Sequence, residues 1–158
     1  MKKSVLAVCV FLFSGLAAHA QSSSTKVDYF SAQEIQKQLA TLGVKAKPSG
    51  GSGSTLAEYS DHQIKLSVRT SSGGAEAHAH YVDVFFVTQG KATLITGGSL
   101  IDAKTGNDGE SKGSGISGGT TQIISKGDVV NIPAGTPHQL KIAQGTTYSS
   151  IVIKIKEQ

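Results

Sequence analysis

The sequence predicts a single all-β domain, a barrel or sandwich of short strands, with one short helix before it. Short runs rich in Val, Ile, Leu and Thr recur through the second two-thirds of the chain, and Gly, Ser, Asn and Asp separate them. Helical periodicity of apolar residues occurs in one early segment. A chain of 158 residues is long enough for one hydrophobic core, so these runs are expected to pack together in one domain.

The first twenty residues resemble a secretory signal peptide rather than part of the fold. A pair of lysines precedes an apolar run, Val5–Leu16, and Ala18–Ala20 has the small-x-small pattern of a cleavage site. The run is shorter than the roughly 20 residues that a membrane-spanning helix needs. We therefore expect an exported protein, periplasmic or secreted. The only cysteine, Cys9, would be removed with the signal, leaving a mature domain without disulfides or thiolate ligands.

The net charge of the chain and the distribution of its basic residues argue against a nucleic-acid partner. The whole chain has 15 basic and 11 acidic side chains, and removing the two signal lysines would leave 13 against 11, a net charge of +2. Arg69 is the only arginine, and no basic cluster stands out. We therefore expect no nucleic-acid partner. No second apolar run is long enough to span a membrane, so no membrane association is expected after signal cleavage.

One helix is predicted over residues 32–42, on the outside of the domain. Ser31 and Glu34 have the spacing of a capping box, with Ser31 as the N-cap. One apolar face repeats at i, i+4 and i+7, through Ile35, Leu39 and Leu42. Gly43 is the expected stop.

A Gly/Ser-rich stretch, residues 47–54, follows the helix and is expected to be a flexible connector inside the same domain. The predicted organisation is thus a signal peptide at 1–20, the helix and connector at 21–54, and the barrel at 55–158. Strands are expected at residues 64–69, 84–88, 92–96, 121–124, 129–132, 139–142 and 151–156.

Residues 97–119 contain eight glycines together with Asp108 and Glu110. A loop of this length in a compact domain is usually functional or disordered. Two interpretations remain open, a lid or pocket rim and a plain surface excursion.

Three histidines form the most informative pattern in the chain. His78 and His80 are two apart, so on a strand their side chains would point to one face. His138 follows the rigid turn 133–137, which contains two prolines and a glycine. A third imidazole brought from another strand could complete one side of a metal site.

These stretches resemble the paired motifs of the cupin superfamily. The second motif is a glycine, five residues, Pro-x-Gly, two residues, His, three residues and Asn. Its spacing is matched by Gly127, Pro133, Gly135 and His138. The first motif is a glycine, five residues, His-x-His, three or four residues, Glu, six residues and a glycine. It is matched by His78, His80 and Gly90. The resemblance covers about residues 73–142 and implies a double-stranded β-helix, the jelly-roll barrel of cupins.

The sequence departs from the cupin pattern at three positions. The first glycine should fall at Ser72, Ile142 stands where Asn is expected, and Asp83 stands for Glu, one residue nearer the His pair than the shorter usual spacing. The resemblance implies that His78, His80, Asp83 and His138 hold one divalent transition metal ion: Zn, Fe, Mn, Ni or Cu. The alternative for Asp83 is a residue at a strand start that hydrogen-bonds the turn.

Glu76 is a competing carboxylate, since it shares strand parity with His78 and His80. It could ligate the metal, act as a base above it, or lie solvated at the barrel mouth. Tyr81 and Glu110 are further candidates for catalytic acid–base groups, with surface or structural roles as the alternative. The apolar lining and core are expected to come from Val82, Val84, Phe85, Phe86, Val87 and Leu94.

Cupins share a fold rather than a reaction, so the resemblance leaves the function open. The first hypothesis is a small-molecule metalloenzyme of dioxygenase, isomerase or lyase type. The alternatives are a non-catalytic periplasmic module that binds a metal or small ligand, and a barrel with a vestigial site. A homodimer formed through edge strands is also expected.

Overall fold

The computed structural model describes residues 27–157. The predicted signal peptide and Cys9 therefore lie outside the described residues. One helix, α1 (Ala32–Ser49), precedes thirteen strands. The strands are β1 (Gly51–Glu58), β2 (His62–Arg69), β3 (Ala75–His78), β4 (Tyr81–Gln89), β5 (Lys91–Thr96), β6 (Ser99–Ile101), β7 (Lys104–Thr105), β8 (Glu110–Gly113), β9 (Gly115–Ser117), β10 (Thr120–Ser125), β11 (Val129–Ile132), β12 (His138–Lys141) and β13 (Tyr148–Lys156). Among these elements, no helix combines the length and apolar character needed to cross a lipid bilayer.

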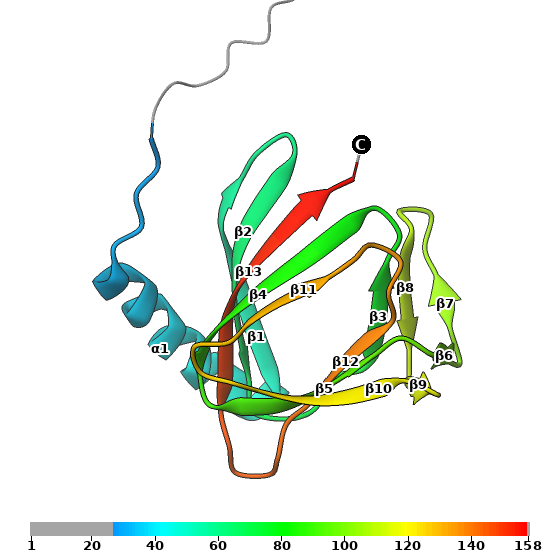
Figure 1. The fold of residues 1–158 in the computed structure, drawn as a ribbon. Coiled ribbons are helices and arrows are strands. Elements are labelled where there is room, and N and C mark those ends of the chain that lie inside the picture. The colour runs from blue at the N-terminus through cyan, green and yellow to red at the C-terminus, as the bar shows by residue number, and fades with distance from the viewer. Residues whose placement is uncertain (1–26, 158) are drawn as a thin grey trace, which may run out of the picture.

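Two antiparallel sheets enclose one interior (Figure 1). The first has the strand order β1-β2-β13-β4-β11, and the second has the order β10-β5-β12-β3-β8-β7. A two-stranded ribbon of β6 and β9 lies at one side, and α1 lies outside the barrel next to β1 and β2. The predicted jelly-roll barrel with one helix is confirmed. Strands far apart in sequence are neighbours, so side chains from both sheets can converge in the interior.

The main hydrophobic core joins the two sheets. Phe85 and Val87 of β4 pack with Leu94 of β5, Ile132 of β11 and Leu140 of β12. Burying side chains of this size contributes about 1.5–3 kcal/mol each, before the entropy of ordering them is subtracted. The expected core residues alternate along β4. Odd-numbered Phe85 and Val87 point inward, whereas Phe86 is 40% exposed, which corrects its assignment to the core.

Helix α1 is longer than predicted. Ser31 caps it as expected, because its Oγ accepts from the Glu34 backbone N–H at 3.1 Å. The helix passes through Gly43 and ends at Gly50, which has a φ of 80° and donates to the Ala46 carbonyl. The prediction of a stop at Gly43 was wrong because Leu42 and Ala46 are buried together against Leu66 and Val68 of β2. This packing outweighs the roughly 1 kcal/mol that a glycine costs in a helix.

The Gly/Ser-rich connector is also corrected, because its first residues belong to α1 and its second half is the start of strand β1. Gly51 lies opposite Arg69 of β2, and Gly53 lies opposite Ser67. Directly opposed residues share a face. These two glycines therefore face the same way as Arg69 and Ser67, and their missing side chains leave space on that face.

The glycine-rich region 97–119 contains four short strands instead of one long loop. Strand β8 joins the second sheet by pairing with β3, and this places Glu110 opposite His78. At Glu110 the region therefore contributes to the rim of the interior, as in the first of the two interpretations. Strand β7 extends the second sheet by pairing with β8, and β6 and β9 form the separate two-stranded ribbon.

Candidate metal centre

Strand β3 supplies two of the converging side chains, Glu76 and His78. They are two apart on a strand, so they share a face. His78 is the last residue of β3, and the turn after it is held by hydrogen bonds. Its carbonyl accepts from Gly135 N–H at 2.8 Å, and Ala79 N–H donates to the Gly109 carbonyl at 3.1 Å. His78 is buried as a result.

His138 enters from the neighbouring strand as the first residue of β12. The turn before it supplies the Thr136 carbonyl, which lies 3.0 Å from His138 Nδ1. In the β12–β3 pairing, His138 stands opposite Glu76. The rigid turn that the sequence analysis singled out therefore determines where this buried imidazole lies.

Asp83 completes the group from the opposite sheet, on β4. Its Oδ2 lies 3.2 Å from His78 Nε2 and 3.7 Å from His138 Nε2. Glu76 Oε1 lies 4.0 Å and 3.5 Å from the same two nitrogens. Two imidazole nitrogens thus face two carboxylates. Within residues 27–157, Glu76, His78 and His138 have ligand atoms that all lie close enough to one another to hold one metal ion.

Hydrogen bonds at the outer side of each ring determine which nitrogen faces the centre. His78 Nδ1 bonds the Glu110 carboxylate, and His138 Nδ1 bonds the Thr136 carbonyl. Because both partners are acceptors, each Nδ1 carries the proton in a neutral ring. Both Nε2 lone pairs are then directed at the centre. Metal-bound histidines almost always have such an outer hydrogen bond.

Two atoms of the centre show that the residues fit a metal ion. His138 Nε2 and Asp83 Oδ1 are buried without a hydrogen-bond partner among the described residues. Buried polar atoms are rarely left unpaired, so each such atom calls for an explanation. A divalent cation would satisfy His138 Nε2 and would balance the charge of two carboxylates. Nitrogen and oxygen ligands suit Zn, Fe, Mn, Ni and Cu.

The pKa values of Glu76 and His78 reflect the same electrostatics. His138 is the main cause that lowers the pKa of Glu76 to about 2, against the opposing effect of burial. Burial is the largest effect on His78 and lowers its pKa, but Asp83 and Glu110 outweigh it, so the pKa of His78 is raised. The carboxylates therefore favour a positive charge between them, which protons or a metal ion can supply.

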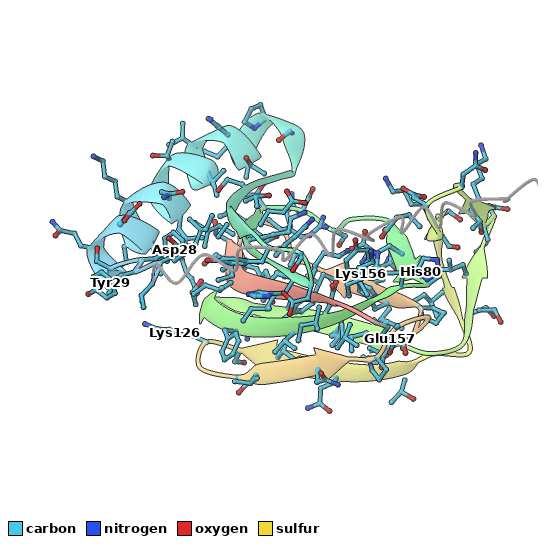
Figure 2. The ribbon with its side chains drawn as sticks, turned by 90° about the horizontal axis from the view of Figure 1, so that it is seen from above. Asp28, Tyr29, His80, Lys126, Lys156 and Glu157 are labelled. Atoms are coloured by element: carbon cyan, nitrogen blue, oxygen red, sulfur yellow. The ribbon has the colours of Figure 1, made fainter. Side chains whose placement is uncertain are left out.

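His80 does not join this group, contrary to the prediction. Strand β3 ends at His78, and residues 79–80 form a turn, so side-chain alternation stops before His80. His80 is exposed, next to Glu157, whose backbone N–H donates to the His80 carbonyl at 2.9 Å (Figure 2). A Cβ atom on Gly109 would lie 2.9 Å from His80 Nε2, so the ring rests against that glycine.

The structure also places the other candidates. Glu110 bonds His78, as described above, and therefore lies outside the group that could hold the ion. The ring centroid of Tyr81 lies 5.3 Å from the Lys154 ammonium. Sequence reasoning missed Lys154, whose Nζ lies 3.8 Å from both Asp83 Oδ1 and Glu110 Oε1. The sequence signal that could have identified it is a lysine in the middle of the last strand, on the face opposite three isoleucines.

A cavity of about 630 Å³ opens from the centre along the interior face of the first sheet. Glu76, His78, Asp83 and His138 line one part of it, and Phe85 adds an apolar wall. The glycine-bearing face of β1 lines another part, and the neighbouring face of β2 carries Lys65, Ser67 and Arg69. This volume is in the range of small-molecule sites.

Comparison with solved structures identifies the architecture. The cupin domain of Cnp3 from Schizosaccharomyces pombe superposes with a TM-score of 0.51 at 12% identity, over 68% of this chain and 61% of that one. This chain has a cupin fold. The lyase DddQ from Ruegeria pomeroyi, which acts on DMSP, has a TM-score of 0.50 at 13% identity, over 69% of this chain and 48% of the lyase.

The polyketide cyclase RemF from Streptomyces resistomycificus gives a TM-score of 0.50 at 17% identity, over 67% of this chain and 65% of the cyclase. The chain thus spans less than two-thirds of each of these three cupin-fold proteins. No protein-family model and no curated protein matches the sequence. At these identities the cupin likeness concerns the fold, and the chemistry must come from the site itself.

Proposed function

We propose that this chain is a small single-domain cupin metalloenzyme, which holds one divalent transition metal ion and converts a small molecule inside its barrel. One observation carries the proposal. His78 and His138 are both held through Nδ1, so that their Nε2 atoms converge with Glu76 and Asp83 at the end of a cavity. Preorganised ligands of this kind are what a metal site requires.

The roles of the side chains follow from their positions. His78, His138, Glu76 and Asp83 would hold the ion. Two imidazoles and two carboxylates would leave open coordination positions on a five- or six-coordinate ion, which is typical of catalytic rather than structural sites. A bound ion of this class supplies Lewis-acid or oxygen-activating chemistry.

The remaining groups would prepare the site. Glu110 holds the His78 ring in orientation, and Lys154 balances the charges of Asp83 and Glu110. Phe85 limits water on the apolar side of the cavity. Lys154, which lines the cavity and is 14% exposed, could move a proton, and the Tyr81 ring lies against its ammonium.

Two of the cupin-fold proteins compared above support the proposal of an enzyme that acts on small molecules. The Ruegeria pomeroyi protein is a lyase, and the Streptomyces resistomycificus protein is a cyclase, both with the same fold. We further propose that the protein is exported. The support for export is the signal-like pattern of residues 1–20.

The test is elemental analysis of protein purified from its own compartment without a polyhistidine tag. We expect about one equivalent of Zn, Fe, Mn, Ni or Cu per chain. Oxygen-consumption screens then follow for Fe, Mn or Cu, and lyase or isomerase screens for Zn or Ni. A metal-bearing protein that shows ligand-dependent thermal stabilisation without turnover would favour the non-catalytic binding module. Protein that neither carries metal nor takes it up on soaking would overturn the proposal.

A further inference from the structure

Arg69, the only arginine in the chain, faces the cavity instead of the solvent-exposed exterior. It ends strand β2, where Gly51 of β1 and Tyr148 of β13 stand opposite it. Residues opposite one another share a face, so the guanidinium emerges beside a strand that carries no side chain at Gly51. On β2 the neighbouring odd positions, Lys65 and Ser67, line the same cavity.

The guanidinium has no anionic partner within the described part of the chain. Arg69 Nε is buried and makes no hydrogen bond to residues 27–157, and no carboxylate in this range pairs with the side chain. Such a buried donor destabilises the fold when it stays unpaired, and more so when it is charged. The Ser150 hydroxyl, also on the cavity wall, is buried without a partner as well.

Glycines make room for the guanidinium. A Cβ atom on Gly73 would lie 2.4 Å from Arg69 Nη1 and 3.0 Å from Cζ, and one on Gly51 would lie 3.7 Å from Nη1. A side chain at Gly73 would therefore displace the arginine. Arg69 and the residues of the metal centre line the same cavity.

The charges along the cavity favour an anionic ligand. Four cationic side chains line it, Lys65, Arg69, Lys112 and Lys154, against three carboxylates, Glu76, Asp83 and Glu110. A divalent ion would offset the charges of Glu76 and Asp83, while Lys154 already contacts Glu110. Lys65, Arg69 and Lys112 then remain without a compensating charge on the lining. Clefts lined by one sign of charge concentrate ligands of the other sign.

On the basis of the proposed function, we propose that the substrate is a small molecule with a terminal oxyanion, either a carboxylate or a phosphate. Arg69 binds this group at the glycine-lined end of the cavity. The guanidinium presents planar donors that match such a group. The Ser150 hydroxyl is the neighbouring cavity group that could add a second donor. Arg69 is thus the residue that selects the ligand, while the centre at His78 and His138 carries the chemistry.

The test uses the fact that a single arginine gives one side-chain Nε–H signal in the spectrum of ¹⁵N-arginine-labelled protein. Metal-free protein is titrated separately with succinate and with inorganic phosphate, so that no anion can bind through a metal. We expect a saturable shift of the signal with at least one probe. A saturable shift with succinate alone identifies a carboxylate ligand, and one with phosphate alone identifies a phosphate ligand.

Calorimetry with the same probe then compares three variants. Arg69→Gln should weaken binding about tenfold or more, because a charge-assisted hydrogen bond is lost. Arg69→Lys, which keeps the charge without the planar fork, should give an intermediate loss. Lys91→Gln removes a charge from an exposed residue that does not line the cavity, and should bind like the parent protein.

Two results would overturn the proposal: no saturable shift with either probe, or equal affinity in the parent and in a folded Arg69→Gln variant. Circular dichroism checks that the variants fold, and the shift on the parent protein needs no variant. Metal content is measured on separate samples. If the protein binds no metal but the arginine signal still shifts, the proposed metalloenzyme function is wrong and the proposed anion site is retained.

Discussion

Asp83 and His138 face each other across the barrel interior from opposite sheets, with Oδ2 3.7 Å from Nε2. Both residues are buried, and each keeps one atom, Oδ1 and Nε2 respectively, without a hydrogen-bond partner within residues 27–157. A carboxylate and an imidazole in this state are costly unless a positive charge lies between them. The predictions about the site follow from this relationship.

Replacing His138 should remove the metal, and replacing His80 should not. His138→Ala deletes an inward Nε2, whereas His80→Ala changes an exposed ring on a turn. We expect metal content measured by mass spectrometry to fall from about one ion per chain to near zero in His138→Ala, because this change removes one of the two imidazoles that converge on the centre. Equal losses in both variants would show that His80 moves inward to bind.

Glu110→Gln should weaken metal binding without abolishing it. The glutamine cannot carry the negative charge that now holds His78 Nδ1, and outer-shell partners of this kind typically contribute 10- to 100-fold in affinity. Competition with a chromophoric chelator measures the change. Asp108→Asn, an exposed change two residues away, is the control and should leave the affinity within twofold, or about 0.4 kcal/mol.

The metal-free protein should lose stability in acid through Glu76. Because the folded pKa of Glu76 is about 2, below its ordinary 4.5, its contribution is fully present above about pH 4.5. The contribution is then lost as the pH falls through about 2. Urea unfolding between pH 5 and 2 should therefore show a shallower decline in Glu76→Gln than in the parent. Glu58→Gln, at an exposed position of β1, should retain the steeper decline of the parent.

Leu42→Ala should destabilise the domain by about 2–5 kcal/mol, since it opens a cavity where α1 packs on Leu66 and Val68. Val44→Ala, on the same helix but 68% exposed, should change stability by less than about 0.5 kcal/mol. Chemical denaturation of both variants provides the measurement. Similar small effects in the two would mean that α1 does not dock on β2.

Gly43→Ala should stabilise the protein by about 0.5–1 kcal/mol. Gly43 lies inside α1, and an added Cβ would meet no atom within 4 Å, so alanine gains helix propensity without a clash. Thermal unfolding reports the shift as a rise of a few degrees. A decrease in the melting temperature would indicate that the helix ends at Gly43 in solution.

The local patterns were sufficient to predict the barrel, the helix start and two of the imidazoles. Ser31 with Glu34 predicted the N-cap because capping depends on residues three apart. The Pro-x-Gly turn predicted that His138 begins a strand, because proline and glycine restrict the local backbone. Asp83 could be predicted only as a candidate. Whether it reaches the imidazoles depends on β4 of the other sheet.

Tertiary structure decided the features that depend on partners distant in sequence. The glycines of β1 indicated a flexible connector, yet pairing with β2 makes them a cavity wall beside Arg69. His80 lies outside the centre because β3 ends at His78 and residues 79–80 form a turn, so strand alternation does not reach His80. The sequence by itself thus determined which residues have the chemistry of a metal centre. Sheet pairing between distant strands decided which of them meet, since side-chain direction follows from register and strand ends.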